Sequence, residues 1–594
     1  MSRSPRVISF VLVSAALAAT AVAACAEARA RFDEPNLAFE QDASIDAEDC
    51  RLQCSLDGRS VIRTCTGEVV ETCSPELACG AGICQEPCAA AAADRSSNGC
   101  EFYLQPPIFS KSYGESCFAA FGGNTSPMPG EGSLEQEGTR LDVSRSLYRT
   151  TPGSAELTPL VGPLAPDESA VLFVFDGPPS GRAHELHCPD GVVTATSVNG
   201  LPVGTGIGTS YHLRTNVPIS LAAIYPFGGA ASHVPSATLL LPVATWGKEH
   251  IIVNAWEASA DNPGAQIVAS EDGTQVTIHP TNNIEDGMGV LGTAAQVPAT
   301  YHLDKGQVLQ LHQRLELSGS IVTSNKPTSV FGGHECMFIP SARWACDKAL
   351  QQLPSFEQWG SEYVGVGYRP RLGNEKEPMP YRIVAARDGT RLEYDPAPPP
   401  GAPLTMSAGE VVTFWSGVGD AFVVRAQDGE HPIYMAAHMA GGGPPPDGAP
   451  DALGNLSFKG IGDAEFVNVV PAGQYLSSYS FFADPTYAET SLVIVRAKNR
   501  GTFADVWLEC AGDLAGWKPV GTRGDYEWTR VDLERRSGPG DAFDGGVCQT
   551  GLHRMRSDGP FTATIWGWAR YASYAYPGGM AQRRLVDTPL APVN

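Results

Sequence analysis

A block reading Leu241-Pro242-Val-Ala-Thr-Trp246-Gly247-Lys-Glu-His-Ile returns later in the chain as Leu353-Pro354-Ser-Phe-Glu-Gln-Trp359-Gly360-Ser-Glu-Tyr. A fainter third copy reads Val470-Pro471-Ala-Gly-Gln-Tyr475-Leu. The first two prolines are 112 residues apart, and the next two are 117 apart. A period of about 110–115 residues is too long for a solenoid unit or a propeller blade, but it suits a β-sandwich of about seven or eight strands. The block therefore indicates tandem β-sandwich units.

Two further features repeat at matching distances. Asp272-Gly273-Thr274 is echoed by Asp388-Gly389-Thr390 and, loosely, by Arg500-Gly501-Thr502. We interpret each as a tight turn, with glycine at positive φ, that leads into a strand. A calcium loop is the alternative, although the D-x-D-x-D-G spacing is missing. Each copy then continues to a short strand that is expected to open at a proline: Pro218, Pro327, Pro432 and Pro560.

The two tryptophans of the repeated block are large side chains next to a glycine. We predict that Trp246 and Trp359 are core or corner aromatics, with stacking against a sugar as the alternative.

The rest of the chain has the texture of an all-β protein. Its 594 residues include 64 Gly and 47 Pro, which is high for a helical protein and ordinary for short strands joined by many turns. One helical patch is expected at residues 85–96, where alanines cluster. Alternating or continuous apolar runs bounded by turn residues predict strands at 169–175, 219–224, 381–385, 411–414, 421–425 and 491–495.

The predicted fold class is thus all-β, with tandem β-sandwich-like repeats preceded by a small disulfide-rich module. The expected segments are a signal peptide at 1–24, an acidic tether at 25–48, a cysteine-rich module at 49–100, a β domain at 101–235, and three β-sandwich repeats at 236–350, 351–465 and 466–594.

The N-terminus reads as an export signal. Arg3 and Arg6 precede an uncharged apolar run from Val7 to Ala24, which ends in small residues before Cys25. This ending resembles a bacterial lipobox, which implies cleavage before Cys25 and attachment of lipid to its sulfur and its new amine. Ordinary signal cleavage nearby, with Cys25 left free, is the alternative.

The cysteines support an oxidising compartment. Of 15 cysteines, removal of Cys25 leaves an even number, and eight of these lie between Cys50 and Cys100. So short a segment buries too little apolar area to fold without disulfides, although a zinc site is a competing interpretation. Among the other six, spacing suggests Cys336–Cys346 and Cys510–Cys548, and elimination then leaves Cys117–Cys188.

Charge narrows the set of partners. The formal net charge is −24, so the surface repels phosphate backbones, and nucleic acid is not expected as a partner.

Two polar constellations could carry chemistry. His184-Glu185-Leu-His187-Cys188 suggests a metal cluster, but its histidines are not spaced as in H-E-x-x-H and Cys188 is more simply a disulfide partner. A Cys336–Cys346 bridge could gather His334, Glu335 and Asp347 to bind a cation or to act as acid and base. The alternative is a stapled surface loop with ordinary polar residues.

Other catalytic signatures are missing from the sequence. It contains no G-x-S-x-G elbow, no Walker lysine loop and no G-x-G-x-x-G after a strand. We therefore predict no catalytic residue, no metal and no cofactor.

The block around Cys336 resembles a known family. Ser324-Asn325-Lys326-Pro327-Thr-Ser-Val-Phe-Gly-Gly333-His334-Glu-Cys336, then Cys346-Asp347, then Leu353-Pro354 and Trp359-Gly360 are similar to the motifs of the IgGFc-binding protein N-terminal domain family. The resemblance spans roughly residues 240–440 and extends more loosely to about 200–580. Lys348 and Gln351 depart from the family pattern of His and Glu, which argues against a shared metal or acid–base site at this loop.

The resemblance implies a surface-exposed binding or adhesive module without catalytic residues, and it does not carry over antibody binding. Two functions are therefore considered. The first is a non-enzymatic lipoprotein of the cell envelope, at the outer membrane or cell surface, which is anchored through its lipid and binds a glycan or protein ligand through sandwich loops. The second is an exported hydrolase acting on polysaccharide or peptide with paired carboxylates.

Overall fold

A computed structural model describes residues 51–55, 58–64, 66–232, 234–259, 261–341, 343, 345–444 and 458–590. The predicted signal peptide, Cys25 and the tether lie outside the described residues, as do Cys50 and Cys65. The chain divides into a small unit, Met1–Arg51 with Arg63–Gly67, and a large unit, Leu52–Ile62 with Glu68–Asn594.

The cysteine-rich module is a set of short strands held by disulfides. Cys54 bonds to Cys79, Cys73 to Cys84, and Cys88 to Cys100, so the zinc alternative is wrong for these six thiols. The Cα of Ala90 lies only 2.4 Å from where a Cβ on Gly80 would be, so that the helix packs directly on a strand. The elements are β1 (Leu52–Cys54), β2 (Ser60–Arg63), β3 (Val69–Thr72), β4 (Ala78–Gly80), β5 (Ile83–Gln85) and the helix α2 (Pro87–Asp94).

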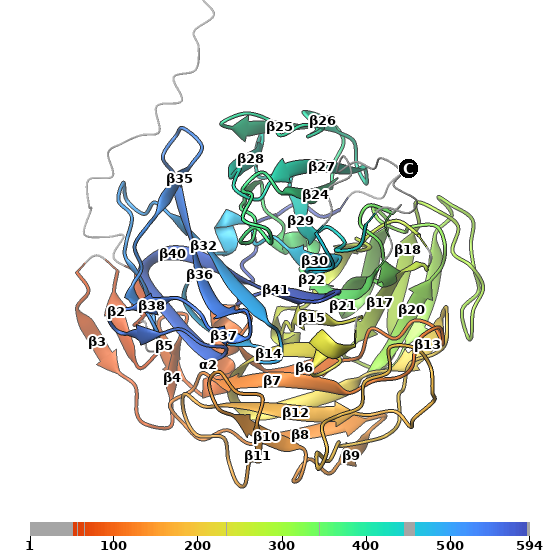
Figure 1. Cartoon of the computed structure of the whole chain (residues 1–594), viewed down its shortest axis with the longest axis horizontal. Helices are drawn as coiled ribbons and strands as arrows, with labels where there is room; N and C mark the ends of the chain where they lie inside the picture. Colours follow the sequence, from red (N-terminus) through yellow and green to blue (C-terminus); the bar gives the residue numbers. More distant parts are fainter. Residues whose placement is uncertain are drawn as a thin grey trace, which may run out of the picture. The chain divides into compact units, whose positions relative to one another are not determined.

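The first β segment forms one sheet in the order β11-β10-β12-β7-β14-β8-β9, with β6 and β15 also paired to β14 (Figure 1). The long strand β14 connects the sheet, because different parts of it pair with β6, β7, β8 and β15. The strands are β6 (Gly99–Leu104), β7 (Phe118–Asn124), β8 (Gly132–Gln136), β9 (Thr139–Leu141), β10 (Leu147–Thr150), β11 (Leu157–Pro159), β12 (Ser169–Phe175), β14 (Tyr211–Tyr225) and β15 (Ser236–Leu239), followed by the 3-10 turn η1 (Gly229–Ala231) between the last two.

The second segment repeats this plan around the long strand β21. Its sheet runs β13-β20-β17-β21-β18-β19, with β16 and β22 also paired to β21. The elements are β13 (Gly206–Thr209), η2 (Val243–Thr245), β16 (Gly247–Ile251), β17 (Pro263–Ala269), β18 (Thr274–His279), β19 (Ala299–Leu303), β20 (Gln307–His312), β21 (Ile321–Met337) and β22 (Asp347–Leu353).

The third segment consists of two sheets, β23-β28-β25-β26 and β27-β24-β29-β30. The elements are η3 (Phe356–Gln358), β23 (Glu362–Gly365), β24 (Pro378–Ala385), β25 (Thr390–Asp395), β26 (Thr405–Met406), β27 (Val411–Gly417), β28 (Phe422–Ala426), β29 (Ile433–Met439) and β30 (Glu465–Asn468).

The fourth segment is built on β40, and its sheet runs β34-β33-β40-β32-β36-β35 with β31 and β41 also paired to β40. The elements are η5 (Ala472–Gln474), β31 (Leu476–Ala483), β32 (Glu489–Ala497), β33 (Val506–Leu508), β34 (Gly512–Asp513), β35 (Lys518–Val520), β36 (Tyr526–Arg535), β37 (Gly538–Pro539), β38 (Ala542–Phe543), β39 (Gly546–Val547), β40 (Gly551–Ala569) and β41 (Ala572–Pro577).

The predicted all-β class is confirmed, since the described chain is almost entirely strand and loop apart from α2 and short 3-10 turns. Apolar side chains are buried throughout the sheets and form the cores. No described helix is long and apolar enough to cross a membrane. The expected domain boundaries stay a prediction: β13 falls in the interval 101–235, yet it pairs with β20 of the next.

Of the four repeated prolines, only Pro432 stands at the start of a strand as expected. Pro218, Pro327 and Pro560 lie inside the long strands β14, β21 and β40, whereas Pro432 immediately precedes β29. Proline has no N–H for a ladder hydrogen bond, so it suits the places where a strand changes partners. In β21, residues up to Ser324 pair with β18, and residues from Thr328 onward pair with β17.

The repeated block forms the junction between successive segments. Each copy is a 3-10 turn (η2, η3 or η5) that begins after the proline and is directly followed by Trp246, Trp359 or Tyr475. Each tryptophan donates its indole N–H to the carbonyl five residues earlier: Trp246 to Leu241 at 3.0 Å and Trp359 to Pro354 at 3.3 Å. The predicted repetition is thus one local structure formed again at each junction.

Candidate functional site

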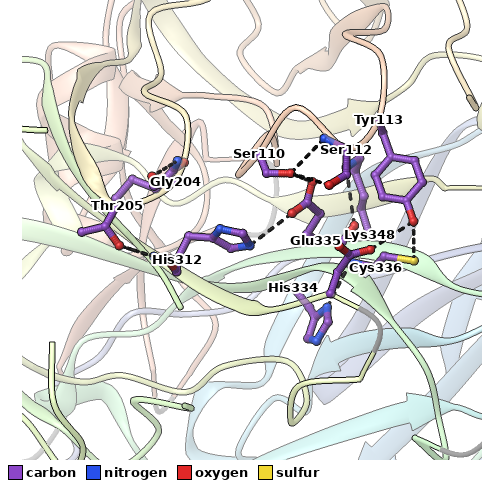
Figure 2. A network of polar contacts seen from close by, with 12 residues as sticks. Ser110, Ser112, Tyr113, Gly204, Thr205, His312, His334, Glu335, Cys336 and Lys348 are labelled. Carbon is purple, nitrogen blue, oxygen red and sulfur yellow. Dashed lines mark hydrogen bonds and ion pairs between the residues drawn. The ribbon is translucent and has the colours of Figure 1, made fainter. Parts of the chain in front are cut away.

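The polar residues next to the Cys336–Cys346 disulfide gather into one network, shown in Figure 2. Glu335 comes from β21, Lys348 from β22 and His312 from the end of β20. The loop between β6 and β7 adds Ser110 and Tyr113, and Asp261 comes from the turn before β17.

Glu335 is the centre of this network and is only 1% exposed. One carboxylate oxygen accepts a hydrogen bond from the Ser110 hydroxyl, and the other lies 3.2 Å from Nε2 of His312. Burial opposes its ionisation, but contact with His312 and the charge of Lys348 outweigh burial and hold the pKa of Glu335 below its usual range. We therefore describe Glu335 as a buried carboxylate.

Lys348 lies behind Glu335 and is also buried. Its ammonium donates to the backbone carbonyl of Glu335 at 3.5 Å and sits 4.6 Å from the centre of the Tyr113 ring, a cation–π contact. Burial lowers the pKa of Lys348 to about 8, and the carboxylates of Glu335 and Asp261 counteract it. The Tyr113 hydroxyl contacts Asp261 Oδ2 at 3.2 Å and Cys336 Sγ at 2.9 Å, which ties the disulfide into the network.

His334 is adjacent to Glu335 but points to the opposite face of the strand (Figure 2), as alternation along a strand requires. Its Nδ1 accepts from the backbone N–H of Cys336 at 3.0 Å, and its Nε2 lies 3.2 Å from the carbonyl of Glu257. Burial lowers the pKa of His334 to about 3, so the ring stays neutral. The surface-loop alternative is wrong for this pair, because both side chains are buried in the sheet.

Asp347 does not join His334 and Glu335. One of its oxygens accepts from the backbone N–H of Ser573 at 2.7 Å, and its electrostatic neighbours are Asp463 and Glu465. The hypothesis of a three-residue His–Glu–Asp site is therefore wrong. Consecutive residues of one strand face opposite sides of the sheet, so His334 and Glu335 point apart. A disulfide between β21 and β22 therefore cannot bring both of them to Asp347.

The structure contains the disulfides that spacing and elimination suggested. Cys336 is bonded to Cys346, Cys510 to Cys548, and Cys117 to Cys188.

The two histidines before Cys188 have different partners. His187 lies 3.0 Å from Asp176 Oδ1 and 3.3 Å from Glu185 Oε1, while Nδ1 of His184 lies 3.1 Å from the Ser232 carbonyl. No group of three or more metal-binding side chains with suitable geometry is found in the described part of the chain.

The Asn325-Lys326-Pro327 motif is structural, because it holds the Asp272-Gly273-Thr274 turn. Asn325 Oδ1 accepts from the backbone N–H of Gln275 at 2.8 Å, and the Lys326 ammonium donates to the carbonyl of Asp272 at 2.6 Å. Gly273 has a φ of +64°, as expected for the turn.

The remaining motif residues are packing positions. At Gly333 a Cβ would lie 2.3 Å from the carbonyl oxygen of Ala349, and at Gly360 it would lie 2.4 Å from Cβ of Pro471. Leu353 is buried and pairs with Val330. Trp359 is 1% exposed and Trp246 9%, so the sugar-stacking alternative is wrong and the core prediction is confirmed.

The network has the wrong order for nucleophilic catalysis. A hydroxyl nucleophile needs a base beside it, with an acid orienting that base. Here the carboxylate of Glu335 stands between the Ser110 hydroxyl and the His312 ring. The arrangement instead resembles an internal brace that connects β20, β21 and the loop between β6 and β7. Sequence reasoning missed Ser110, Tyr113, Asp261 and His312, since nothing in their local sequence connects them to β21.

Comparison with known proteins agrees with the sequence motifs. The family model described as IgGFc binding protein matches residues 236–567. The IgGFc-binding protein of Homo sapiens is 29% identical over 203 residues, which cover 34% of this chain and 4% of the human protein. The match therefore spans a small part of that relative's length. Because the family model covers more than half of the chain, this protein belongs to the IgGFc-binding protein family.

Proposed function

We propose that this chain is a non-enzymatic binding protein of the cell envelope that holds a protein ligand on exposed loops of its second β segment. Membership of a family named for binding supports a binding role. The observation that carries the proposal is a group of exposed aliphatic side chains. Leu291 is 80% exposed and Met288 63%, and with them we define the loop surface as Val203, Met288, Leu291, Val297 and Leu315.

The loops that bear these residues contact one another. The backbone N–H of Met288 donates to the carbonyl of Thr205 at 3.0 Å, which joins the loop before β13 to the loop between β18 and β19. Asn282 donates to the carbonyl of Glu316 at 2.6 Å, which adds the loop between β20 and β21. The loops that carry these exposed aliphatic side chains are thus joined at the surface, and exposed apolar patches are typical of protein interaction sites.

Hydrogen bonds to residues of the sheet hold the loops of the loop surface in place. The Thr205 hydroxyl donates to the carbonyl of His312 and accepts from its N–H, both at 3.1 Å. His312 in turn contacts Glu335, so the buried network braces the loops (Figure 2). Tyr301 also donates to the carbonyl of Leu291 at 3.1 Å. A pre-ordered loop loses little entropy on binding.

A protein ligand fits this surface better than a glycan. Sugar rings stack on exposed aromatic faces. Among the described residues, the exposed large hydrophobic side chains are Leu, Val, Ile and Met, with no Phe, Tyr or Trp. Aromatic side chains such as Trp507 and Trp517 are only half-exposed, so the most exposed apolar groups of the described chain favour a protein ligand over a glycan.

The hydrolase alternative gains no support from the polar network. Its carboxylate is engaged by Ser110 and His312, and its lysine lies beneath Tyr113.

Display outside the cell is part of the same proposal. The lipobox-like ending before Cys25 supports export and lipid anchoring, and the even cysteine number of the remaining chain supports an oxidising compartment. We place the protein at the outer membrane or cell surface.

The proposal is tested with purified residues 26–594 on an array of extracellular proteins, antibody Fc included, alongside an array of glycans. We expect saturable binding to at least one protein, with every array member chemically unchanged by mass spectrometry. Binding to glycans alone, or turnover of any array member, contradicts the proposal.

A further inference from the structure

Three buried carboxyl groups meet where β22, β30 and β41 pack together. Asp347 begins β22, Glu465 begins β30, and Asp463 lies two residues earlier. All three are fully buried. Ser573 of β41 joins two of them: its backbone N–H donates to Asp347 Oδ2 at 2.7 Å, and its hydroxyl accepts from the backbone N–H of Asp463 at 2.8 Å.

In each carboxyl group, one oxygen accepts a hydrogen bond and the other lacks a hydrogen-bond partner. Asp463 Oδ1 accepts from the backbone N–H groups of Ala464 at 2.9 Å and Gly442 at 3.2 Å. Glu465 Oε1 accepts from Phe466 at 2.8 Å, and the backbone N–H of Ala575 in β41 also faces this carboxyl group. The other oxygens, namely Asp347 Oδ1, Asp463 Oδ2 and Glu465 Oε2, have no hydrogen-bond partner among the described protein atoms. A buried ionised oxygen without a donor is strongly destabilising, whereas a protonated carboxyl is much less so.

The surroundings offer little positive charge to compensate. Arg371 faces Asp463, but its guanidinium is paired with Glu377 at 2.7 Å. Tyr487 faces Asp347 and Glu465. Asp484 approaches from the end of β31, beside Tyr487 and Tyr574, and is itself buried with one unpartnered oxygen.

We propose that Asp347, Asp463 and Glu465 form a proton-dependent clasp, which holds β22, β30 and β41 together while the carboxyl groups are protonated and weakens the junction when they ionise. These strands belong to the second, third and fourth segments, so the clasp controls how firmly the segments are joined. It involves neither the loop surface nor the network at Glu335.

The direction of the pH dependence follows from burial. Burial raises the pKa of all three groups, that of Asp463 to about 7, and the neighbouring acids raise the pKa of Asp347 further. A carboxyl whose pKa is higher in the folded chain contributes stability that is complete below its unfolded pKa and is lost as pH rises through the folded pKa. For Asp463 this window runs from about pH 4 to about pH 7.

The test is the melting temperature of residues 26–594 at pH 5 and at pH 8, compared with Asp463→Asn and Glu465→Gln. The amides keep size and hydrogen-bonding capacity but cannot ionise. We expect the melting temperature of the unaltered chain (the parent) to fall by about 5 °C or more from pH 5 to pH 8. The melting temperature of each variant should fall less. Asp505→Asn is the matched control, because this aspartate is 81% exposed and should retain the parent slope.

If a variant fails to fold, a spectroscopic measurement on the unaltered chain still tests the proposal. Infrared difference spectra should show the carbonyl stretch of protonated carboxylic acids persisting at pH 7. The same pH slope in parent, Asp463→Asn and Glu465→Gln, or no protonated-acid band at pH 7, would overturn the proposal.

Discussion

The side-chain amide of Gln358 donates a hydrogen bond to the backbone carbonyl of Thr245 at 2.7 Å, although the two residues are 113 positions apart. Gln474 repeats the contact one period later, donating to the carbonyl of Gln358 at 3.0 Å. Both glutamines end a 3-10 turn of the repeated block. The sequence period is therefore the spacing of junctions in which each turn is bonded to the turn before it.

Replacement of Gln358 by alanine tests this ladder. The change leaves a buried carbonyl without its donor, which should lower the free energy of unfolding by about 1–3 kcal/mol. Gln275→Ala, at an exposed strand position, is the control and should change little. Chemical denaturation of both variants measures the difference. Equal stabilities would show that the ladder is incidental.

The glycine of the Trp-Gly pair should tolerate no side chain. Gly360→Ala places a Cβ 2.4 Å from Cβ of Pro471 in the next copy, so we expect a loss of about 1–3 kcal/mol. Gly429→Ala is the control, since nothing lies within 4 Å of its Cβ position. A Gly360→Ala variant as stable as the control would contradict the close approach.

The Cys336–Cys346 disulfide should stabilise the chain. It closes a loop over a sequence separation of 10 and touches the network through Tyr113. The Cys336→Ser/Cys346→Ser variant should lose about 2–4 kcal/mol. Non-reducing peptide mapping of the parent provides the covalent check, and free thiols at these positions would refute the pairing.

The contribution of Glu335 to stability should depend on pH in the opposite direction to that of the clasp. Its pKa is lowered in the folded chain, so its stabilisation is present above its unfolded pKa and is lost as pH falls through the folded value. Glu335→Gln should therefore flatten the acid side of the stability profile. Thermal melts across the acid range test this expectation, and an unaltered acid limb would contradict it.

Lipid attachment at Cys25 predicts a covalent label. Cells fed a palmitate analogue should tag the protein, and Cys25→Ala should abolish the tag. Labelling that persists in Cys25→Ala would rule out this anchor.

The fold class was predictable because it depends on local pattern. Apolar runs such as Ser169–Phe175 and glycine-centred turns such as Asp272-Gly273-Thr274 are determined by neighbouring residues, and the structure forms both. The prolines were harder to interpret: a strand that changes partners at Pro327 is continuous in space, while in sequence the proline resembles a start.

The site was less predictable because it depends on which face of a strand each residue occupies. His334 and Glu335 are neighbours in sequence but point apart, and Asp347 meets Ser573, which is 226 residues away. Lys348 could be noted as a departure from the family pattern, but only the fold shows that it lies behind Glu335 and over Tyr113. No local signal linked Ser110 to a strand 225 residues away.

The most direct test of the proposed function is the affinity of a Leu291→Asp variant for the protein captured on the array. Leu404→Asp is the matched control, because Leu404 is 58% exposed and lies outside the loop surface. We predict that Leu291→Asp raises the dissociation constant by about tenfold or more, while Leu404→Asp leaves it nearly unchanged and both variants melt like the parent. Equal affinity of the parent and Leu291→Asp would contradict binding through the loop surface.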